Sequence, residues 1–530
     1  MGLATLLLVL VGLTFILRIV SEKWRHRQNA KRLGCQPAPM APSKDPLAIG
    51  DILEIIQADK DKVVPELLES RTNIMRDNNA GRYVSTFRLK RGLGENLLTF
   101  DPENLQAMLA KQFKDFSVGG ERLGCMGPLL GKGIFINDGA EWSHSRTMLR
   151  PQFTREQISD LGLEERHVQN AMRAIPAAGS NGWTEVDIQS IYFRLTLDSA
   201  TELLFGESCY SQLAAMGDAE DRMASGGKVT DFGKNFDRAQ WYMAQRLRLP
   251  RMKFLYDNKE FRTCCQEVHR FVDECVAKAL HDHKKKKKQQ QQLLEEGASE
   301  HYIFVHAMAE TTKDPIELRS QLLNVLLAGR DTTAALLSWT TLLLSRHPEV
   351  FHKLREAIIA DFGTYENPQN ITFATLKACT YLQQVMNETL RLFPPLPTNA
   401  RYATKDTSLP RGGGPDGQSP VYIKKGQAVL YNVHMLHRRE DVWGKDAKEF
   451  KPERWEARRS GWEYLPFNGG PRICIGQQFA LTEAGYVLVR MLQRFDEIED
   501  VHADQRIRWG LTLVSAPGDT VTVRLHEASR

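Results

Sequence analysis

Cysteine is scarce in this chain, and its few positions form no familiar pattern. Eight cysteines occur among 530 residues, at positions 35, 125, 209, 264, 265, 275, 379 and 474. The sequence contains no C-x-x-C pair and no dense cysteine framework, so it suggests neither a zinc cage nor a disulfide scaffold. This usage fits a reducing compartment, and each cysteine has to be judged by the residues around it.

A strong excess of one charge sign is also missing. The 70 basic and 65 acidic residues give a net charge of +5 at pH 7, which on so long a chain gives no reason to expect a nucleic-acid partner. A local basic face could still serve an acidic protein partner. No G-x-G-x-x-G stretch follows a strand and opens a helix, so the chain shows no flavin or nicotinamide motif of its own.

One long apolar run stands at the N-terminus. Residues 2–17 carry no charge, and with Ile19 and Val20 the run reaches about 19 residues, roughly the length that spans a bilayer as a helix. Basic residues follow it, which by the positive-inside rule places the rest of the chain in the cytosol. A cleaved signal peptide is the alternative, but it would carry positive charge before the apolar run. We therefore expect a single-pass transmembrane anchor over residues 1–22, in the endoplasmic reticulum membrane.

Residues 23–46 are basic and rich in proline, and we expect a linker there. Prolines at positions 37, 39, 42 and 46 favour a stiff, extended chain. Residues 47–530 show no second break in composition, so we expect them to form one large domain. Its low-complexity tract, Lys284–Lys288 followed by Gln289–Gln292, is expected to be a solvated loop between helices. A nuclear-import signal is the alternative for this tract.

The body shows long helical patterns and few strands. One helix is expected from Asp314, an N-cap residue followed by proline, to Arg346, just before a His-Pro pair. Short strands are expected at Val421–Ile423 and Val429–Tyr431, after a Gly- and Pro-rich turn at Pro410–Pro420. The predicted fold class is therefore mainly α with a small β portion.

Cys474 lies in a distinctive segment that reads F-x-x-G-x-R-x-C-x-G from Phe467 to Gly476. Glycines there allow the backbone to turn tightly and to approach a flat macrocycle. Backbone N–H groups after Cys474 can point at its sulfur and lower its pKa, and Arg472 can pair with a haem propionate. Phe467 would shield the sulfur from water. The segment favours Cys474 as the thiolate ligand of a haem iron, with a buried structural cysteine as the alternative.

A second segment of interest, Ala328–Thr333, falls in the middle of the long helix and reads A-G-R-D-T-T. Its small residues would admit a flat cofactor and dioxygen against the helix. A threonine hydroxyl can bond back to the carbonyl of the preceding turn and loosen the helix locally. An acid next to an alcohol can supply and position the protons that oxygen chemistry consumes. Alone, the segment could equally be an ordinary helix surface.

Two pairs of residues have spacings that place both side chains on one helix face. Glu388 and Arg391 are three residues apart, and Trp142 and Arg146 are four residues apart. The indole N–H of Trp142 and the guanidinium of Arg146 can both be directed at a propionate. Each pair by itself is also compatible with ordinary surface packing.

In these segments and in their order along the chain, the sequence resembles the cytochrome P-450 family over almost the whole body. The resemblance implies the cytochrome P-450 fold, with haem b held by the Cys474 thiolate. It also implies that Thr332 is the alcohol and Asp331 the acid of a proton relay. Among the other haem contacts it implies Arg472, Trp142, Arg146, Arg401, Phe467 and Gly476.

The resemblance also gives Glu388 and Arg391 a third partner, Arg454, in a buried network that shapes the loop carrying the thiolate. It sharpens in the stretches 144–153, 328–333, 409–420 and 467–483, which look like the fungal family 52 branch. That branch hydroxylates the terminal carbon of n-alkanes and long-chain fatty acids. Asn468 departs from it, because the branch often has glycine there. Pocket residues are expected in 113–136 and 396–399.

The activity that this resemblance implies is that of a membrane-anchored monooxygenase. It would insert one atom of O₂ into a C–H bond of a lipophilic substrate, with electrons from an NADPH–cytochrome P-450 reductase that docks on a basic surface near Arg472. Three alternatives stay open: tailoring of a lipid-like fungal secondary metabolite, a haem-thiolate isomerase or dehydratase, and a non-enzymatic haem carrier or gas sensor. The isomerases typically lack the pair that Asp331 and Thr332 form here.

Overall fold

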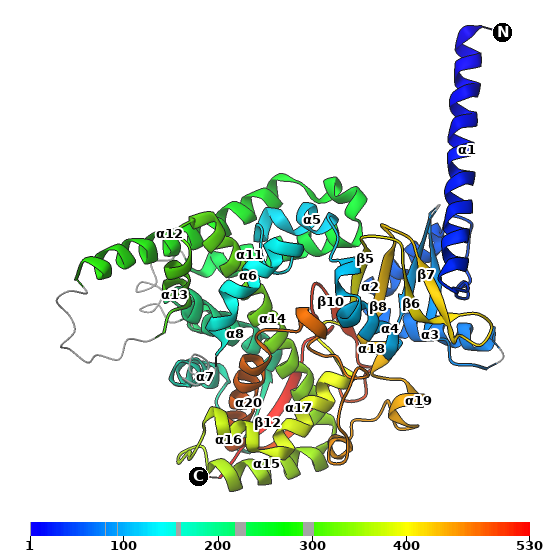
Figure 1. Ribbon diagram of the computed structural model, residues 1–530. Coiled ribbons are helices and arrows are strands. Elements are labelled where there is room, and N and C mark those ends of the chain that lie inside the picture. Colours follow the sequence, from blue (N-terminus) through cyan, green and yellow to red (C-terminus); the bar gives the residue numbers. More distant parts are fainter. Residues whose placement is uncertain are drawn as a thin grey trace.

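The computed structural model describes residues 2–79, 81–92, 94–154, 161–217, 229–289 and 302–529. Helices make up most of this part of the chain, and small sheets lie mainly on the side from which the N-terminal helix leaves the body (Figure 1). The expected fold class, mainly α with a small β portion, is confirmed. The low-complexity residues Gln290–Gln292 lie outside the described residues.

The α-helices have the following bounds: α1 (Leu3–Arg32), α2 (Ile49–Lys60), α3 (Val64–Asp77), α4 (Pro102–Gln106), α5 (Glu121–Leu130), α6 (Gly139–Leu149), α7 (Gly162–Ala174), α8 (Ile188–Phe205), α9 (Ser211–Met216), α11 (Val229–Arg248), α12 (Lys259–Gln289), α13 (Phe304–Thr311), α14 (Pro315–Arg346), α15 (Pro348–Phe362), α16 (Phe373–Ala378), α17 (Thr380–Leu392), α18 (Val433–Leu436), α19 (Glu440–Trp443) and α20 (Gln477–Arg494). Short 3₁₀ or π turns are η1 (Ala107–Lys111), η2 (Phe113–Asp115), η3 (Arg150–Phe153), η4 (Pro250–Tyr256), η5 (Pro452–Trp455) and η6 (Gly470–Arg472).

The strands form four small sheets. Their bounds are β1 (Thr86–Arg91), β2 (Gly94–Thr99), β3 (Phe116–Ser117), β4 (Trp183–Asp187), β5 (Thr398–Ala403), β6 (Thr407–Gly413), β7 (Ser419–Ile423), β8 (Ala428–Asn432), β9 (Phe495–Asp500), β10 (Trp509–Leu511), β11 (Ser515–Pro517) and β12 (Thr522–Glu527). The largest sheet has the order β1-β2-β8-β5-β3, in which only β2 and β8 run parallel. The others are β4-β12-β9, β6-β7 and β10-β11.

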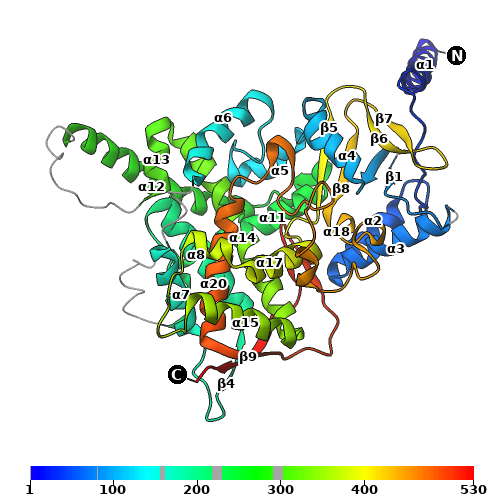
Figure 2. The same cartoon turned by 60° about the horizontal axis from the view of Figure 1, so that its bottom comes forward.

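The long helix α14 has the ends that the sequence predicts. The Asp314 side chain accepts a hydrogen bond from the Ile316 N–H at 2.9 Å, and Pro315 occupies the first turn, where its missing N–H costs nothing. At the other end His347 closes the helix before Pro348, which starts α15. The 32 residues of α14 pass through the body beside α8 and α20 (Figure 2). Because α14 is enclosed by its neighbours, the residues in its middle lie at the centre of the domain.

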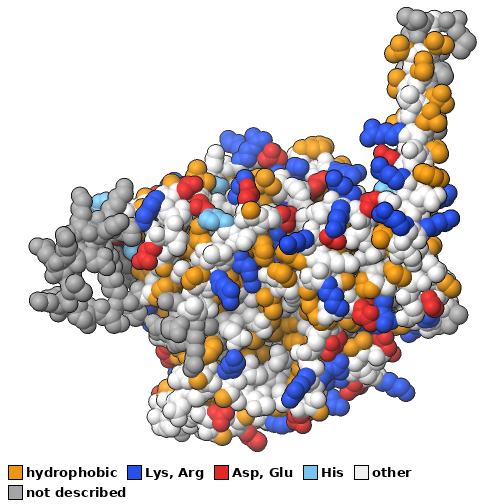
Figure 3. Space-filling model, in the orientation of Figure 1, with side chains coloured by type: hydrophobic (Ala, Val, Ile, Leu, Met, Phe, Trp, Pro, Cys, Tyr) orange, Lys and Arg blue, Asp and Glu red, His pale blue; other side chains and the backbone are white. Residues whose placement is uncertain are grey.

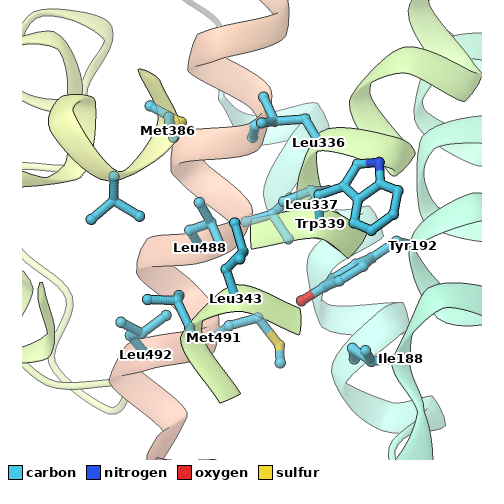
Figure 4. Packing of buried hydrophobic residues seen from close by; sticks show 14 of the residues in the cluster. Ile188, Tyr192, Leu336, Leu337, Trp339, Leu343, Met386, Leu488, Met491 and Leu492 are labelled. Atoms are coloured by element: carbon cyan, nitrogen blue, oxygen red, sulfur yellow. The ribbon is translucent and has the colours of Figure 1, made fainter. Parts of the chain in front are cut away.

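The main hydrophobic core surrounds the second half of α14. Side chains from α8, α14, α17 and α20 meet there, including Tyr192, Trp339, Met386 and Leu488 (Figure 4). The Trp339 ring stacks on Phe393 with their centroids 4.3 Å apart. Each such side chain contributes roughly 1.5–3 kcal/mol when fully buried. This packing fixes α14 and α20 relative to each other, and the two motifs that the sequence singles out lie within α14 and directly before α20.

The buried network around Glu388 is confirmed. Its carboxylate accepts hydrogen bonds from Arg391 Nε at 2.8 Å and from Arg454 Nε at 3.2 Å. The Trp455 indole N–H at 3.1 Å and the Lys451 backbone N–H at 3.0 Å complete its partners. Glu388 and Arg391 are both fully buried. The network therefore joins α17 to η5, close before the segment that leads to Cys474.

Helix α1 departs from the sequence prediction in its length and its character. It continues to Arg32, so the basic residues expected in a linker complete the helix, where positive charge suits the C-terminal end of the helix dipole. Its last turns attach to the body, with His26 Nδ1 2.8 Å from the Tyr422 hydroxyl. None of the helices in the described part of the chain combines the length and apolar character needed to cross a bilayer. The expected transmembrane anchor is thus not shown.

Two loop predictions were wrong. Lys284–Gln289 continue helix α12 instead of forming a loop, in keeping with the good helix propensity of lysine and glutamine. The first part of the expected turn at 410–420 belongs to strand β6. The buried Asn104 side chain bonds both backbone groups of Arg411 at 2.9 Å, which satisfies the edge of that strand from a distant segment.

Candidate functional site

Cys474 lies in the turn between η6 and α20. Its backbone N–H donates to the carbonyl of Phe467 at 2.9 Å, which closes the loop from Phe467 to Cys474, and the Gly476 N–H donates to its sulfur. Cys474 lies deep in the molecule, yet its side chain is accessible, and that of neighbouring Ile473 is 40% exposed. A thiol in this position faces an open space within the fold, to which a ligand has access.

Two residues of this loop have a left-handed backbone, Asn468 with φ +63° and Gly470 with φ +68°. A Cβ built on Gly470 would overlap the carbonyl oxygen of Leu109 in η1. Glycine is therefore required at position 470 for two reasons: its left-handed backbone angle and the close approach of another chain segment. Asn468 tolerates the left-handed region better than most residues, and its side-chain oxygen accepts a hydrogen bond from the Tyr431 hydroxyl at 3.2 Å. The loop thus accommodates asparagine at position 468, where glycine was the alternative.

Arg472 points inward from the loop and not toward the outer surface. It donates to the Asn137 carbonyl at 2.9 Å and to Asp138 Oδ1 at 2.7 Å. Its guanidinium lies 4.5 Å from the ring centroid of Trp142. Arg472 is therefore engaged within the fold, while Arg150 at the end of α6 is exposed. The docking surface expected near Arg472 stays a prediction.

Arg472 is one of four arginines that gather near the loop. Arg146 donates to the Ile473 carbonyl at 3.0 Å, and Arg401 is buried on β5. Arg122 on α5, which the sequence did not single out, faces both Arg401 and Arg472. Burial, reinforced by the charge of Arg401, lowers the pKa of Arg122 to about 10.

The same pattern holds for Arg472. Burial lowers its pKa to about 10, Asp138 opposes the shift, and Arg401, Arg122 and Arg146 reinforce it. The carboxylate that bonds into this arginine cluster is Asp138, which the sequence also did not single out. We define the arginine cluster as Arg122, Arg146, Arg401 and Arg472. Its positive charges outnumber the carboxylates bonded to it, as is typical of a site for an anionic ligand.

The pKa of Cys474 differs from the prediction. The N–H of Gly476 lowers it, as expected, and the charge of Arg146 lowers it too, but burial raises it by more. Desolvation disfavours the thiolate, so the surrounding protein alone does not keep this thiol ionised. A bound cation would have to supply the missing stabilisation.

On α14, the expected bond from Thr332 back to the preceding turn is present, and the helix is continuous through it. The Thr332 hydroxyl donates to the carbonyl of Ala328 at 2.6 Å. A Cβ added to Gly329 would meet no atom within 4 Å, so this turn of α14 borders open space although the helix is largely enclosed. The small residues Ala328 and Gly329 therefore leave room beside the threonine, as the sequence predicts.

Asp331 is directed toward helix α11 and not toward Thr332. Its side chain is buried beside Arg330 and Gln240. The pKa of the Asp331 carboxyl is raised to about 6, because burial and the charge of Asp237 raise it by more than Arg330 and Gln240 lower it. A carboxyl with this pKa exchanges its proton near neutral pH, which suits a proton donor.

The two segments expected to contribute pocket residues meet in the structure. Arg122 in the first segment donates to the Asn399 side chain in the second at 2.8 Å and to the Phe135 carbonyl at 3.0 Å. His144, which precedes Arg146 by two residues, is 2.8 Å from Glu317 on the outer face of α14. His144 is therefore occupied at the surface, away from the Cys474 loop.

Comparison with known proteins places these features in one family. The family model described as Cytochrome P450 matches residues 65–518. A cytochrome P450 monooxygenase named g430, from a Fusarium species, is 50% identical over 503 residues, covering 94% of this chain and 86% of its own. Cytochrome P450 52A13 from Debaryomyces hansenii is 49% identical over 413 residues, 77% of each chain. Cytochrome P450 52A10 from Candida maltosa is 47% identical over 441 residues, covering 82% of this chain and 81% of its own.

A solved structure shares the fold. The haem domain of cytochrome P450DA superposes with a TM-score of 0.73 and 22% identity, over 93% of this chain and 98% of that one. At this identity the likeness concerns the fold alone. The agreement extends over nearly the whole of both chains, so the helices that frame the Cys474 loop have the same overall arrangement.

The contact between Gly470 and Leu109 generates a first prediction. Replacing Gly470 with alanine should lower the stability by about 1–2 kcal/mol for its left-handed backbone and by about 1–3 kcal/mol more for the overlap. Gly426 offers a matched control, because its φ is +79° but a Cβ there meets nothing within 4 Å. Thermal unfolding of both variants measures the difference. Equal destabilisation by Gly470→Ala and Gly426→Ala would show that the close approach does not constrain the loop.

Proposed function

Because this chain belongs to the cytochrome P450 family, whose members are haem-thiolate enzymes, and is a monooxygenase of that family, we propose that it hydroxylates long-chain aliphatic substrates. The substrates would be n-alkanes or fatty acids, attacked at or near the terminal carbon. One observation carries this proposal: relatives at 47–49% identity over three quarters of the chain or more are family 52 cytochromes P450. Family 52 is the branch that its motifs resemble, and that branch hydroxylates such chains.

The residues around Cys474 fit haem b. Cys474 would ligate the iron, whose charge stabilises the thiolate against its burial. The arginine cluster together with Trp142 would pair with the two propionates, and these anions would balance the surplus of positive charge. Gly476 bonds the sulfur through its N–H, and Phe467 closes the loop in front of it. When bound, the haem supplies the activation of dioxygen.

Thr332 and Asp331 would move the protons that oxygen activation consumes. Thr332 stands at the open turn of α14, where its hydroxyl can exchange its bond to Ala328 for a bond to a bound molecule. Asp331 would give up a proton near neutral pH and take up a new one from the side that faces α11. Since the two side chains bond different neighbours, water or a side-chain rotation has to connect them.

Electrons would come from an NADPH-dependent reductase on the same membrane, since the sequence lacks a nucleotide-binding motif of its own. We assign the membrane attachment to residues 1–22, the linker to residues 23–46 and the haem-binding unit to residues 47–530. Apolar side chains on α1 point outward, among them Leu6, Leu10 and Phe15. They cover the part of α1 that projects from the body, with Lys and Arg side chains nearer its base (Figure 3). The endoplasmic reticulum membrane is the proposed location.

Asp331 and Thr332 weigh against the alternatives from other classes. A haem-thiolate isomerase or dehydratase draws on no external electrons, and a haem carrier or gas sensor needs no proton donor. A buried carboxyl with a pKa of about 6 next to a threonine would have no use in either. Tailoring of a lipid-like secondary metabolite by the same chemistry is distinguished only by the substrate.

The proposed substrate class is tested by reconstituting the full chain with a fungal NADPH–cytochrome P450 reductase. We expect NADPH oxidation that depends on n-hexadecane or palmitate, and a product hydroxylated at the terminal carbon, identified by mass spectrometry. A matched alkane of four or six carbons should give little product, since a short chain buries less apolar surface. Oxidation of NADPH without any hydroxylated alkane or fatty acid would reject this substrate class and favour a metabolite-tailoring role.

The role of Thr332 makes a second prediction for function. Thr332→Ala removes the hydroxyl, so electrons should be diverted to hydrogen peroxide and the product formed per NADPH should fall by about tenfold or more. Thr332→Ser keeps the hydroxyl and should restore most of the yield. Product and peroxide are measured in the same reaction. An unchanged product yield in Thr332→Ala would show that this hydroxyl has no part in proton delivery.

The proposed attachment to membranes is tested with substitutions in α1 of the full chain. A variant with Leu10→Lys and Leu13→Lys places two charges on the apolar part, each costing roughly 2.5–3.5 kcal/mol at the centre of a membrane helix. We expect this variant in the soluble fraction after cell lysis and high-speed centrifugation. A control with Lys23→Gln and Arg27→Gln likewise changes two residues of α1 but leaves the apolar part intact, and it should stay with the membranes. Equal membrane binding by both variants would place the attachment elsewhere.

A further inference from the structure

A single buried arginine lies between two carboxylates next to the proposed proton donor. Arg330 on α14 is 5% exposed and forms a two-pronged ion pair with Asp237 on α11, with its Nη2 3.2 Å from Asp237 Oδ2. Its Nη1 is also 3.4 Å from Asp331 Oδ1. Rings of Phe193 and Phe236 lie about 6 Å from the guanidinium carbon, which holds the group in a fixed position.

The hydrogen bonds of this trio are unequally divided. Asp237 takes both prongs of the Arg330 guanidinium, whereas Asp331 is left with a contact to one nitrogen. Among the described residues, neither Asp331 Oδ1 nor Arg330 Nε has a hydrogen-bond partner. An unsatisfied buried oxygen is costly, especially on an ionised carboxylate. Asp331 would be better satisfied if Asp237 did not compete for the arginine.

From this geometry we propose that Asp237 is a positioning residue that favours the protonated form of Asp331 by engaging the guanidinium of Arg330. The inference rests on the proposed role of Asp331 as proton donor and adds the residue that sets its acidity. Asp237 itself acts through Arg330 and touches no reacting group. Asp237 lies on helix α11, outside the sequence motif of α14 that contains Arg330 and Asp331.

Charge balance gives the physical reason. The trio holds one positive charge and two carboxyl groups, so it is neutral only when one carboxyl is protonated. Asp237 has a side chain that is 57% exposed and is solvated, whereas that of Asp331 is 9% exposed. Water stabilises the charge on Asp237, so the proton resides on Asp331.

The charged groups that face this site come from two helices. On α14 Arg330 favours the ionised form of Asp331, and on α11 Asp237 favours the protonated form while Gln240 donates a hydrogen bond. The Cys209 thiol also faces Arg330 and is itself kept neutral, because burial raises its pKa. Removal of the negative charge at position 237 leaves Arg330 to pair with Asp331 alone. The pKa of Asp331 should then fall.

The experiment uses the full-length holoenzyme with Asp237→Asn, which keeps the size of the side chain and removes its charge. The carboxylic acid band of Asp331 in pH-difference infrared spectra, assigned by its loss in Asp331→Asn, should titrate about one pH unit lower than in the wild type, the scale of a single nearby charge. Product per NADPH should decline at correspondingly lower pH. Lost protonation above the lowered pKa is the direct cause of that decline.

Glu260→Gln is the matched control. Glu260 is also an exposed carboxylate paired with an arginine of α11, Arg238, but it does not face Asp331. This variant should leave both the infrared band and the pH profile as in the wild type. The same shift in Glu260→Gln and Asp237→Asn would contradict a specific effect of Asp237.

The remaining outcomes separate this inference from the proposed function. An infrared band that stays in place in Asp237→Asn overturns the inference, whatever the catalytic role of Asp331. An unchanged product yield in Asp331→Asn would instead overturn the role of Asp331 as donor. In that case a shifted band would still support the control of Asp331 by Asp237.

Discussion

The carboxylate of Glu388 is the fixed point on which the arrangement of the Cys474 loop depends. A fully buried charge is stable only when every lone pair has a partner, and here two arginines, an indole N–H and a backbone N–H provide them. Arg391 then extends the network to the carbonyls of His437 and Ala447 at 2.8 and 2.6 Å. Loss of one partner from such a pair costs about 3–5 kcal/mol. The network thus ties the irregular segment between α18 and α20 into one position.

That irregular segment forms few of the regular backbone–backbone hydrogen bonds that stabilise helices and sheets. Its backbone is neither helix nor sheet over much of its length, so side chains have to satisfy the polar groups that secondary structure would otherwise satisfy. His437 does so through its ring, accepting the Leu465 N–H at 2.9 Å. The loop that carries Cys474 can be rigid without being regular because these bonds hold it from behind.

Features that depend on near neighbours in sequence could be predicted. The ends of α14 follow from Asp314, Pro315 and Pro348, and the bond from Thr332 to Ala328 follows from helix geometry. The loop from Phe467 to Cys474 likewise closes through a local hydrogen bond. In each of these cases the chemical groups that determine the structure are within a few residues of one another.

Features that depend on the packing of segments far apart in the sequence could not be predicted. Arg122 reaches the arginine cluster because α5 packs against the strand that carries Asn399, and Asp237 reaches Arg330 only when α11 lies across α14. Neither residue stands in a pattern that sequence reasoning can distinguish from ordinary surface charge. Strand β6 pairs with nearby β7, but the Asn104 side chain that bonds the backbone of Arg411 in β6 is about 300 residues away in sequence.

The two groups of buried arginines show how structure separates stability from ligand binding. Arg391 bonds to two carboxylate oxygens and three carbonyls, so its charge is fully compensated within the chain. Arg122, Arg401 and Arg472 instead face one another, and burial together with mutual repulsion lowers the pKa of Arg122 and of Arg472 to about 10. A fold does not gain stability from such an arrangement by itself. We propose that an anion with two negative groups would relieve this repulsion, so the cluster would serve ligand binding, whereas the Glu388 network supports the fold.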